Sequence, residues 1–357
     1  MVKSWRLWPR WAGYAAAVAG LGYGLLGAFW AVGGGGFPFG VGDPDVSPEA
    51  ILAHVTPAGA GWWIFGLGAG GAVLGLMLAR GNPGRGGRGL LAGLAFALAT
   101  GLIVVAPDER LLSHVAYTPL VAVMTPFGGV HGLTVASAWP WPMVNMLVLG
   151  LIGLLFVGAA VAFLRRAREA CLACGRSDRP GRVSAARVGR WASYLAFILP
   201  FGYAASRWCW ALGIPLGVSD AWLAEMRATY PDVFAAGTYL ATFAALGGVL
   251  CLGLTRRWGE VVPRWVPYLR GRRLPPGLAI IPATIVSLAF LSGGFAIVRD
   301  HLGKALSGAG SELGGAADLL WIVLPLWGVT LSTATIACRL RRRTTCATCG
   351  RGATAAA

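Results

Sequence analysis

Two short cysteine pairs are the residues of this 357-residue chain whose type and spacing most clearly point to chemistry. Cys171-Leu-Ala-Cys174-Gly and Cys346-Ala-Thr-Cys349-Gly repeat one Cys-x-x-Cys-Gly pattern. Together they offer four sulfur ligands, which is a common set for a structural Zn²⁺ in tetrahedral geometry. Arginines flank both pairs and favour the thiolate, the form of cysteine that binds metal. The sequence therefore predicts that Cys171, Cys174, Cys346 and Cys349 bind zinc as a structural cofactor.

Each pair resembles a zinc knuckle, and two knuckles together resemble a zinc-ribbon site. One zinc ion bound to both pairs would join two tails that lie far apart in the sequence. Three other interpretations stay open: a redox or regulatory dithiol, a zinc ion shared between two chains, and tails that bind no metal. The remaining cysteines, Cys209, Cys251 and Cys338, lie in apolar segments, where we expect them to pack as small hydrophobic side chains.

Long apolar segments must position these pairs. Hydrophobic residues make up 56% of the chain and charged residues only 12%, whereas a soluble domain is about 25% charged. This composition excludes a soluble globular protein and a disordered chain. Segments of about 20 apolar residues can cross a bilayer, and eight are found: 11–33, 58–79, 89–107, 143–164, 191–214, 236–255, 277–298 and 318–338. We predict an all-α integral membrane protein with eight transmembrane helices. A cleaved signal peptide is the alternative for residues 1–33.

The net charge of +16 is distributed unevenly along the chain. Of the 30 lysines and arginines, 25 lie in the N-terminal segment, in alternate connections between the apolar segments, and at the C-terminus. The positive-inside rule places this side in the cytoplasm. We therefore expect a multi-pass protein of the cell membrane with both termini in the cytoplasm. The apolar content argues against a nucleic-acid partner, so the lipid bilayer is the expected surrounding.

The two halves of the chain share a sequence pattern. Aromatic residues of the first segment recur 180 positions later, in the pairs Trp11/Trp191, Tyr14/Tyr194, Tyr23/Tyr203 and Trp30/Trp210. The cysteine tails recur at a spacing of 175. We predict a tandem duplication, with residues 1–176 as the first four-helix repeat and residues 177–357 as the second. Because four is an even number, both repeats are expected to insert the same way up, as in parallel-repeat transporters.

Short motifs carry one wider resemblance. Trp30-Ala31-Val32-Gly33 and Trp210-Ala211-Leu212-Gly213 follow the first span of each half, and Arg257-Trp258-Gly259-Glu260 precedes Pro263. These motifs, with the Arg- and Ala-rich composition, resemble uncharacterised polytopic membrane proteins of actinobacteria. The resemblance implies a duplicated eight-span architecture and no particular activity.

The side opposite the basic one carries the histidines and most of the acidic residues. No ligand spacing links His54, His114, His131 and His301, so we interpret this polar group as ordinary solvated side chains, with a metal or ion site as the weaker alternative. Arg207 is the one charge well inside a span, and such charges are often functional. Asp220 is its expected partner, and the two form a candidate contact for a substrate or ion. Segment 108–142 is expected to be re-entrant or interfacial.

The function predicted from these features is small-solute transport through a site between the repeats, with the zinc ion as a structural clasp. The alternative is a non-transporting scaffold, or a sensor of zinc or redox state that recruits a cytoplasmic protein partner. No Walker A, His-Glu-x-x-His or Gly-x-Ser-x-Gly motif occurs in the sequence. We therefore do not expect an enzyme.

Overall fold

The computed structural model describes residues 8–46, 50–127, 134–177, 185–262, 270–306, 320–343 and 345–352. In this part of the chain the regular structure is helical, apart from one isolated bridge between Val261 and Arg273. Its long helices are α2 (Trp8–Ala31), α3 (Pro57–Arg80), α4 (Arg85–Thr100), α7 (Trp141–Ala167), α8 (Ala185–Ala211), α10 (Pro231–Gly253), α11 (Pro276–Leu306) and α12 (Leu320–Arg341). A π-helical turn, Gly101–Val105, continues α4. The prediction of an all-α fold is confirmed for these residues.

Shorter helices lie between the long ones. They are α5 (Arg110–Met124), α6 (Val135–Ala138) and α9 (Asp220–Thr229), together with 3-10 turns at Gly40–Gly42, Thr125–Phe127 and Arg257–Gly259. Segment 108–142 therefore contains α5 and α6, and Pro119 lies inside α5. Its predicted interfacial position stays a prediction.

Seven helices in the described ranges are long and apolar enough to cross a membrane: α2, α3, α4 with its π turn, α7, α10, α11 and α12. They indicate a multi-pass membrane protein. Helix α8 corresponds to the fifth predicted span, 191–214, and is not among these seven. Its composition is more polar, because Arg187 and Arg190 lie near its start and Arg207 near its end. Seven spans are thus supported by length and composition, and the eighth stays a prediction.

The chain divides into two compact units. Unit 1 comprises residues 1–108, 136–181 and 343–357, and unit 2 comprises residues 109–135 and 182–342. This division differs from the predicted repeat boundary in two places. The C-terminal tail groups with unit 1, and segment 109–135 groups with unit 2 because α5 packs on α11. There Leu112 fills the space beside Gly293, where an added Cβ would lie 2.5 Å from the Leu112 Cβ.

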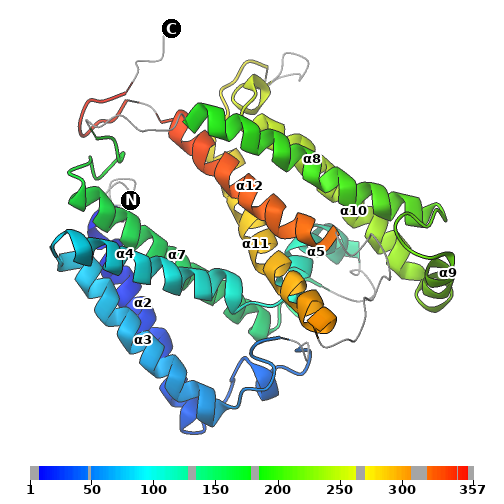
Figure 1. The fold of residues 1–357 in the computed structure, drawn as a ribbon, viewed down its shortest axis with the longest axis horizontal. Helices are drawn as coiled ribbons and strands as arrows, with labels where there is room; N and C mark the ends of the chain where they lie inside the picture. The colour runs from blue at the N-terminus through cyan, green and yellow to red at the C-terminus, as the bar shows by residue number, and fades with distance from the viewer. Residues whose placement is uncertain are drawn as a thin grey trace. The chain divides into compact units, whose positions relative to one another are not determined.

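Both units pair their long helices in the same order. In unit 1, α2 packs on α3, α4 on α7, and α2 on α7; in unit 2, α8 packs on α10, α11 on α12, and α8 on α12 (Figure 1). The first helix of each unit also ends in the same way. The N–H of Gly33 bonds to the Trp30 carbonyl at 3.1 Å, and the N–H of Gly213 bonds to the Trp210 carbonyl at 3.1 Å. Both glycines have positive φ, which stops the helix.

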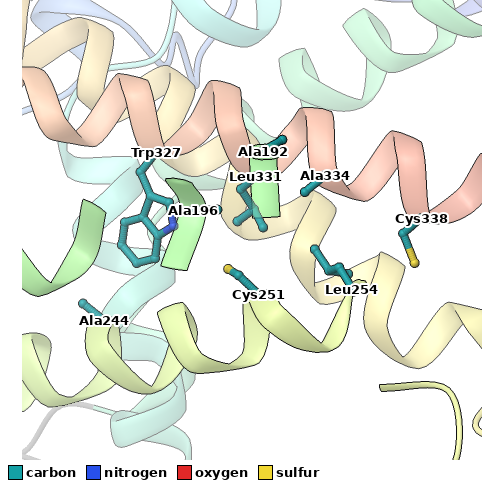
Figure 2. Close-up of a cluster of buried hydrophobic side chains, with 9 residues drawn as sticks. All are labelled: Ala192, Ala196, Ala244, Cys251, Leu254, Trp327, Leu331, Ala334 and Cys338. Atoms are coloured by element: carbon teal, nitrogen blue, oxygen red, sulfur yellow. The ribbon is translucent and has the colours of Figure 1, made fainter. Parts of the chain in front are cut away.

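Small residues bring the first two helices of each unit together. A Cβ added at Gly68 of α3 would lie 2.5 Å from the Gly24 Cα of α2, so these backbones touch. In unit 2, Ala196 of α8 packs with residues of α10 and α12 in a core that includes Cys251, Leu331 and Trp327 (Figure 2). Cys251 and Cys338 are buried in this core, as predicted for packing cysteines.

Candidate metal centre

The four predicted cysteines lie together in unit 1, with all four sulfur atoms within 4.8 Å of one another. The Cys171 Sγ lies 3.9 Å from the Cys346 Sγ, and the Cys174 Sγ lies 3.7 Å from the Cys349 Sγ. A tetrahedral Zn²⁺ with Zn–S bonds of about 2.3 Å holds its sulfur ligands about 3.8 Å apart. A disulfide requires about 2.05 Å between sulfurs. The spacing therefore fits a four-sulfur metal site.

Each cysteine pair folds into the same small loop. The N–H of Cys171 donates to the Arg176 carbonyl at 2.9 Å, and the N–H of Gly175 donates to the Cys171 carbonyl at 2.6 Å. In the C-terminal tail, the N–H of Cys346 donates to the Arg351 carbonyl at 3.0 Å, and the N–H of Gly350 donates to the Cys346 carbonyl at 2.8 Å. Gly175 and Gly350 have φ values of 74° and 67°. Only glycine adopts this left-handed conformation without strain, which explains the Cys-x-x-Cys-Gly pattern.

Arginine side chains join the two loops to each other. The Arg176 Nη1 donates to the Arg351 carbonyl at 2.7 Å, and the Arg343 Nη1 donates to the Cys174 carbonyl at 2.6 Å. The Arg165 Nη1 also donates to the Leu172 carbonyl at 2.8 Å, which fixes the first loop to the end of α7. These contacts hold the backbone of both loops around the sulfurs.

Thiols of this cluster shift one another's ionisation in opposite directions. Backbone N–H groups of Cys349 and Thr348 lower the pKa of Cys346 to about 6, and the N–H of Cys174 lowers the pKa of Cys171. The Arg351 N–H acts to lower the pKa of Cys349, but desolvation and the three neighbouring thiols outweigh it and raise that pKa to about 11. Four thiolates at these distances repel one another, and a bound Zn²⁺ removes that repulsion.

The predicted histidines do not form a metal-binding group among the described residues. His54 is exposed in unit 1, whereas His114 and His301 belong to unit 2, where each Nδ1 lies within 2.9 Å of a carbonyl one turn earlier in its helix. His131 lies outside the described residues. Over the described ranges, the four cysteines are the only group of three or more His, Cys, Asp or Glu residues close enough to share a metal ion.

Arg207 and Asp220 are not brought together as predicted. Asp220 is exposed at the first turn of α9, where Ser219 caps the helix by accepting from the Trp222 N–H. Arg207 is half-buried among aromatic rings of unit 2. Among the described side chains, no ion pair joins the two residues. Asp220 begins α9 and is exposed there, which its closeness to Arg207 in the sequence did not reveal.

Sequence reasoning also missed Trp321, whose ring centroid lies 4.9 Å from that of His301 and 6.0 Å from the Arg207 Cζ. Trp321 lies at the start of α12, 114 positions after Arg207 and far from it in sequence. No local pattern signals such a contact.

The chain was compared with known proteins at three levels. No family model, no curated protein and no solved structure matches it. Its function must therefore be argued from its own residues.

Proposed function

We propose that this chain is a multi-pass membrane protein in which Cys171, Cys174, Cys346 and Cys349 bind one structural Zn²⁺. The observation that carries this proposal is the separation of the sulfurs, 3.7 and 3.9 Å across the two loops. The ion would join the segment after α7 to the C-terminal tail, as a clasp. Because one chain supplies all four sulfurs, the geometry favours this arrangement over zinc shared between two chains.

Metal analysis of the purified protein tests the clasp. We expect about one zinc per chain, and its loss when Cys171 and Cys346 are both replaced by serine, since two thiolates cannot complete a closed structural site. Cys209→Ser is the matched control, because Cys209 is partly buried in a different cluster. Wild-type protein purified without metal, or equal zinc loss in the control, would contradict the proposal.

The cysteine cluster also supports the eight-span topology. Between Cys174 and Cys346 the chain passes through α8, α10, α11 and α12. If α8 did not cross the bilayer, three crossings would leave the two cysteine pairs on opposite sides. That arrangement is incompatible with sulfurs 3.7 Å apart. We therefore infer that α8 is the eighth span and, by the positive-inside rule, that both termini and the zinc lie in the cytoplasm.

The polar residues of α8 are compatible with a bilayer. The Ser193 hydroxyl donates to the Cys251 carbonyl at 2.6 Å, and the Ser206 hydroxyl donates to the Tyr203 carbonyl at 2.8 Å. Hydrogen bonds of this kind satisfy hydroxyl groups where no water is present. Arg187 and Arg190 belong to the basic end, at the start of the helix.

For the membrane part we propose small-solute transport. Its support is a group of buried polar atoms without hydrogen-bond partners in unit 2, from Arg299, Asp300, His301 and Trp321. Unpaired polar atoms in an apolar bundle are costly, and are typical of sites where a ligand or water supplies the partner. The scaffold or sensor alternative is favoured by the partial exposure of the four cysteines, which leaves them open to a protein partner.

Cysteine labelling distinguishes the two functions. A Cβ at Gly237 of α10 would lie 3.8 Å from the Arg207 Cδ, whereas one at Gly247 would lie 3.8 Å from the Trp327 ring, in the core. If a water-filled path reaches Arg207, Gly237→Cys reacts with a membrane-impermeant thiol reagent in intact cells, and Gly247→Cys does not. A scaffold packed with apolar side chains leaves both variants at the wild-type background.

A further inference from the structure

Arg207 carries a positive charge that no described carboxylate neutralises. Its Cζ lies 4.3 Å from the ring centroid of Trp210, 5.0 Å from that of Tyr203 and 6.0 Å from that of Trp321. Within the described ranges, neither Asp220 nor Asp300 lies within ion-pair distance of it. Aromatic faces attract a guanidinium but do not use its N–H donors, which point along the plane of the group. Those donors are left for another partner.

The same aromatic group contains two further unpartnered nitrogens. The Trp321 Nε1, an N–H donor, is buried without a hydrogen-bond partner. The His301 Nδ1 lies 2.9 Å from the Ile297 carbonyl and must carry the proton, because a carbonyl only accepts. The His301 Nε2 is therefore the free nitrogen, and it too is buried without a partner. The rings of His301 and Trp321 lie 4.9 Å apart.

Charged side chains flank His301 in the sequence of α11. The Arg299 Nη1 is also buried without a hydrogen-bond partner, two residues before His301. Asp300 is the nearby carboxylate in sequence, and its Oδ2 pairs with the Lys304 Nζ at 3.1 Å while its Oδ1 has no partner. Among the described residues of this stretch of α11, Arg299 and Lys304 thus accompany one acidic side chain.

Helix α5 contributes a phenol to the same region. Burial raises the pKa of Tyr117, as do the neighbouring Tyr203 and Tyr239, whereas the charge of Arg207 lowers it. The Tyr117 ring stacks on that of Tyr239 with centroids 5.9 Å apart.

We propose that Arg207, Trp321 and His301 form a binding site for a small oxyanion, that is, a ligand with a carboxylate or phosphate group. The guanidinium binds two oxygens of such a group in a bidentate manner. The Trp321 Nε1–H donates to an oxygen, and the His301 Nε2 accepts from a hydroxyl of the ligand. This proposal names the class of solute that the membrane part would carry, and it rests on the transport function proposed above.

The site belongs to one half of the chain. Gly27 occupies the sequence position that corresponds to Arg207, 180 residues earlier. Gly27 packs against α3, where an added Cβ would lie 2.6 Å from the Ile64 Cγ2. No arginine fits there, so we expect one oxyanion site per chain.

Calorimetry on the full-length, zinc-loaded protein in neutral detergent tests the site, with sodium acetate and inorganic phosphate as probes. We expect at least one probe to bind, and Arg207→Gln to weaken its binding by about tenfold or more, the usual loss for a charged hydrogen-bonding partner. Trp321→Phe keeps the ring and removes the N–H, and is expected to weaken binding severalfold. Arg257→Gln, which removes an exposed charge at the other end of unit 2, is the matched control.

A lipid headgroup offers the same phosphate chemistry, so a second arm uses nanodiscs. Protein is reconstituted in phosphatidylcholine with or without phosphatidic acid, and co-purified phosphatidic acid is measured after detergent exchange. Retention that depends on Arg207, without binding of the free probes, supports the site and identifies lipid as its ligand. Equal behaviour of Arg207→Gln and Arg257→Gln in both arms overturns the proposal.

Uptake in proteoliposomes separates this proposal from transport itself. Binding that requires Arg207, in the absence of acetate or phosphate uptake, keeps the oxyanion site and contradicts transport of these solutes. Uptake that persists at the wild-type rate in Arg207→Gln keeps transport and contradicts the oxyanion site.

Discussion

The two units agree at their basic ends and differ at the opposite ends. In unit 1 the Arg166 guanidinium donates to the carbonyls of Leu78 and Ala79 at the end of α3. In unit 2 the Arg341 guanidinium donates to the Leu254 carbonyl at 2.9 Å and to that of Thr255 at 3.5 Å. An arginine of the fourth long helix thus caps the second in each unit.

A second contact recurs at these ends. The Arg80 Nε lies 3.1 Å from the Tyr14 hydroxyl oxygen, and the Arg256 Nη2 lies 3.2 Å from that of Tyr194. At the other end the units differ, because Arg207 of unit 2 is surrounded by Tyr203 and Trp210 whereas the corresponding Gly27 packs tightly on α3. The comparison indicates that contacts at the basic ends are shared by the two units, whereas the half-buried charge of Arg207 is found in unit 2 alone of the two corresponding positions.

Zinc removal is expected to have the largest effect. A ligand bound at a thousand times its dissociation constant stabilises the native state by about 4 kcal/mol, so a strong chelator should lower the melting temperature by several degrees or more. If the two loops are equivalent, Cys174→Ser and Cys349→Ser lose zinc equally and shift the melting temperature by the same amount. Differential scanning fluorimetry with parallel metal analysis measures both. A melting temperature that chelation leaves unchanged would show that the clasp has no structural role.

Removal of the helix-capping arginines should come next. Arg166→Ala leaves the Leu78 and Ala79 carbonyls without this donor, and Arg341→Ala does the same to Leu254 and Thr255. We expect each to destabilise the protein by about 1–3 kcal/mol, the cost of unsatisfied partly buried polar groups. Thermal unfolding in detergent checks this. A loss in one variant alone would break the similarity of the two basic ends.

Helix packing should respond differently in the two units. Gly68→Ala introduces a Cβ 2.5 Å from the Gly24 Cα, so α2 and α3 must separate, at about 1–3 kcal/mol. Ala244 holds the corresponding position of unit 2 at the repeat spacing of 176 and is buried. Ala244→Gly should cost about 1 kcal/mol through backbone entropy. Thermal unfolding of both variants measures the contrast, and a larger loss in Ala244→Gly would reverse it.

The loop glycines sharpen the comparison of the two tails. Both Gly175→Ala and Gly350→Ala strain a left-handed backbone, at about 1 kcal/mol each. A Cβ at Gly175 would also lie 2.9 Å from the Arg165 Nε, whereas nothing lies within 4 Å at Gly350. We therefore expect Gly175→Ala to weaken zinc affinity more than Gly350→Ala in a competition with a chromophoric chelator. Equal affinities would indicate that the Arg165 contact does not constrain the loop.

The smallest effects are expected at Tyr14 and Tyr194. Replacement by phenylalanine removes the hydroxyl that contacts Arg80 or Arg256 and keeps the ring over which each guanidinium lies. These contacts are exposed, so each variant should lose about 0.5 kcal/mol or less. Thermal unfolding of the single and double variants measures this, and additive losses are expected because the two sites belong to different units.

Patterns that depend on neighbouring residues were predicted well. Most ends of the long helices lie within six residues of the predicted spans, because a run of apolar residues determines both length and burial. Helix α11 continues to Leu306, eight residues past its predicted end. The Cys-x-x-Cys-Gly pattern determined each loop, since the residue after the second cysteine has positive φ, which favours glycine. The packing role of Cys251 and Cys338 followed from their apolar surroundings, and both are buried.

Contacts between distant residues were predicted less well. Arg207 was expected to pair with Asp220, thirteen positions later, but α9 holds Asp220 at an exposed helix start. Segment 109–135 was assigned to the first half by its place in the sequence, although α5 packs on α11 of unit 2. Such contacts depend on which helix faces meet, and composition does not encode that choice in any local pattern.

The sequence by itself determined that this chain is built from long apolar helices and that it carries two loops with the same Cys-x-x-Cys-Gly pattern. Both follow from local chemistry, the length of apolar runs and the spacing of cysteine and glycine. Only the tertiary structure decided that all four sulfurs meet within 4.8 Å and that the Arg207 Cζ lies 6.0 Å from the ring centroid of Trp321. Both arrangements join residues more than a hundred positions apart in the sequence, and no local pattern predicts such contacts.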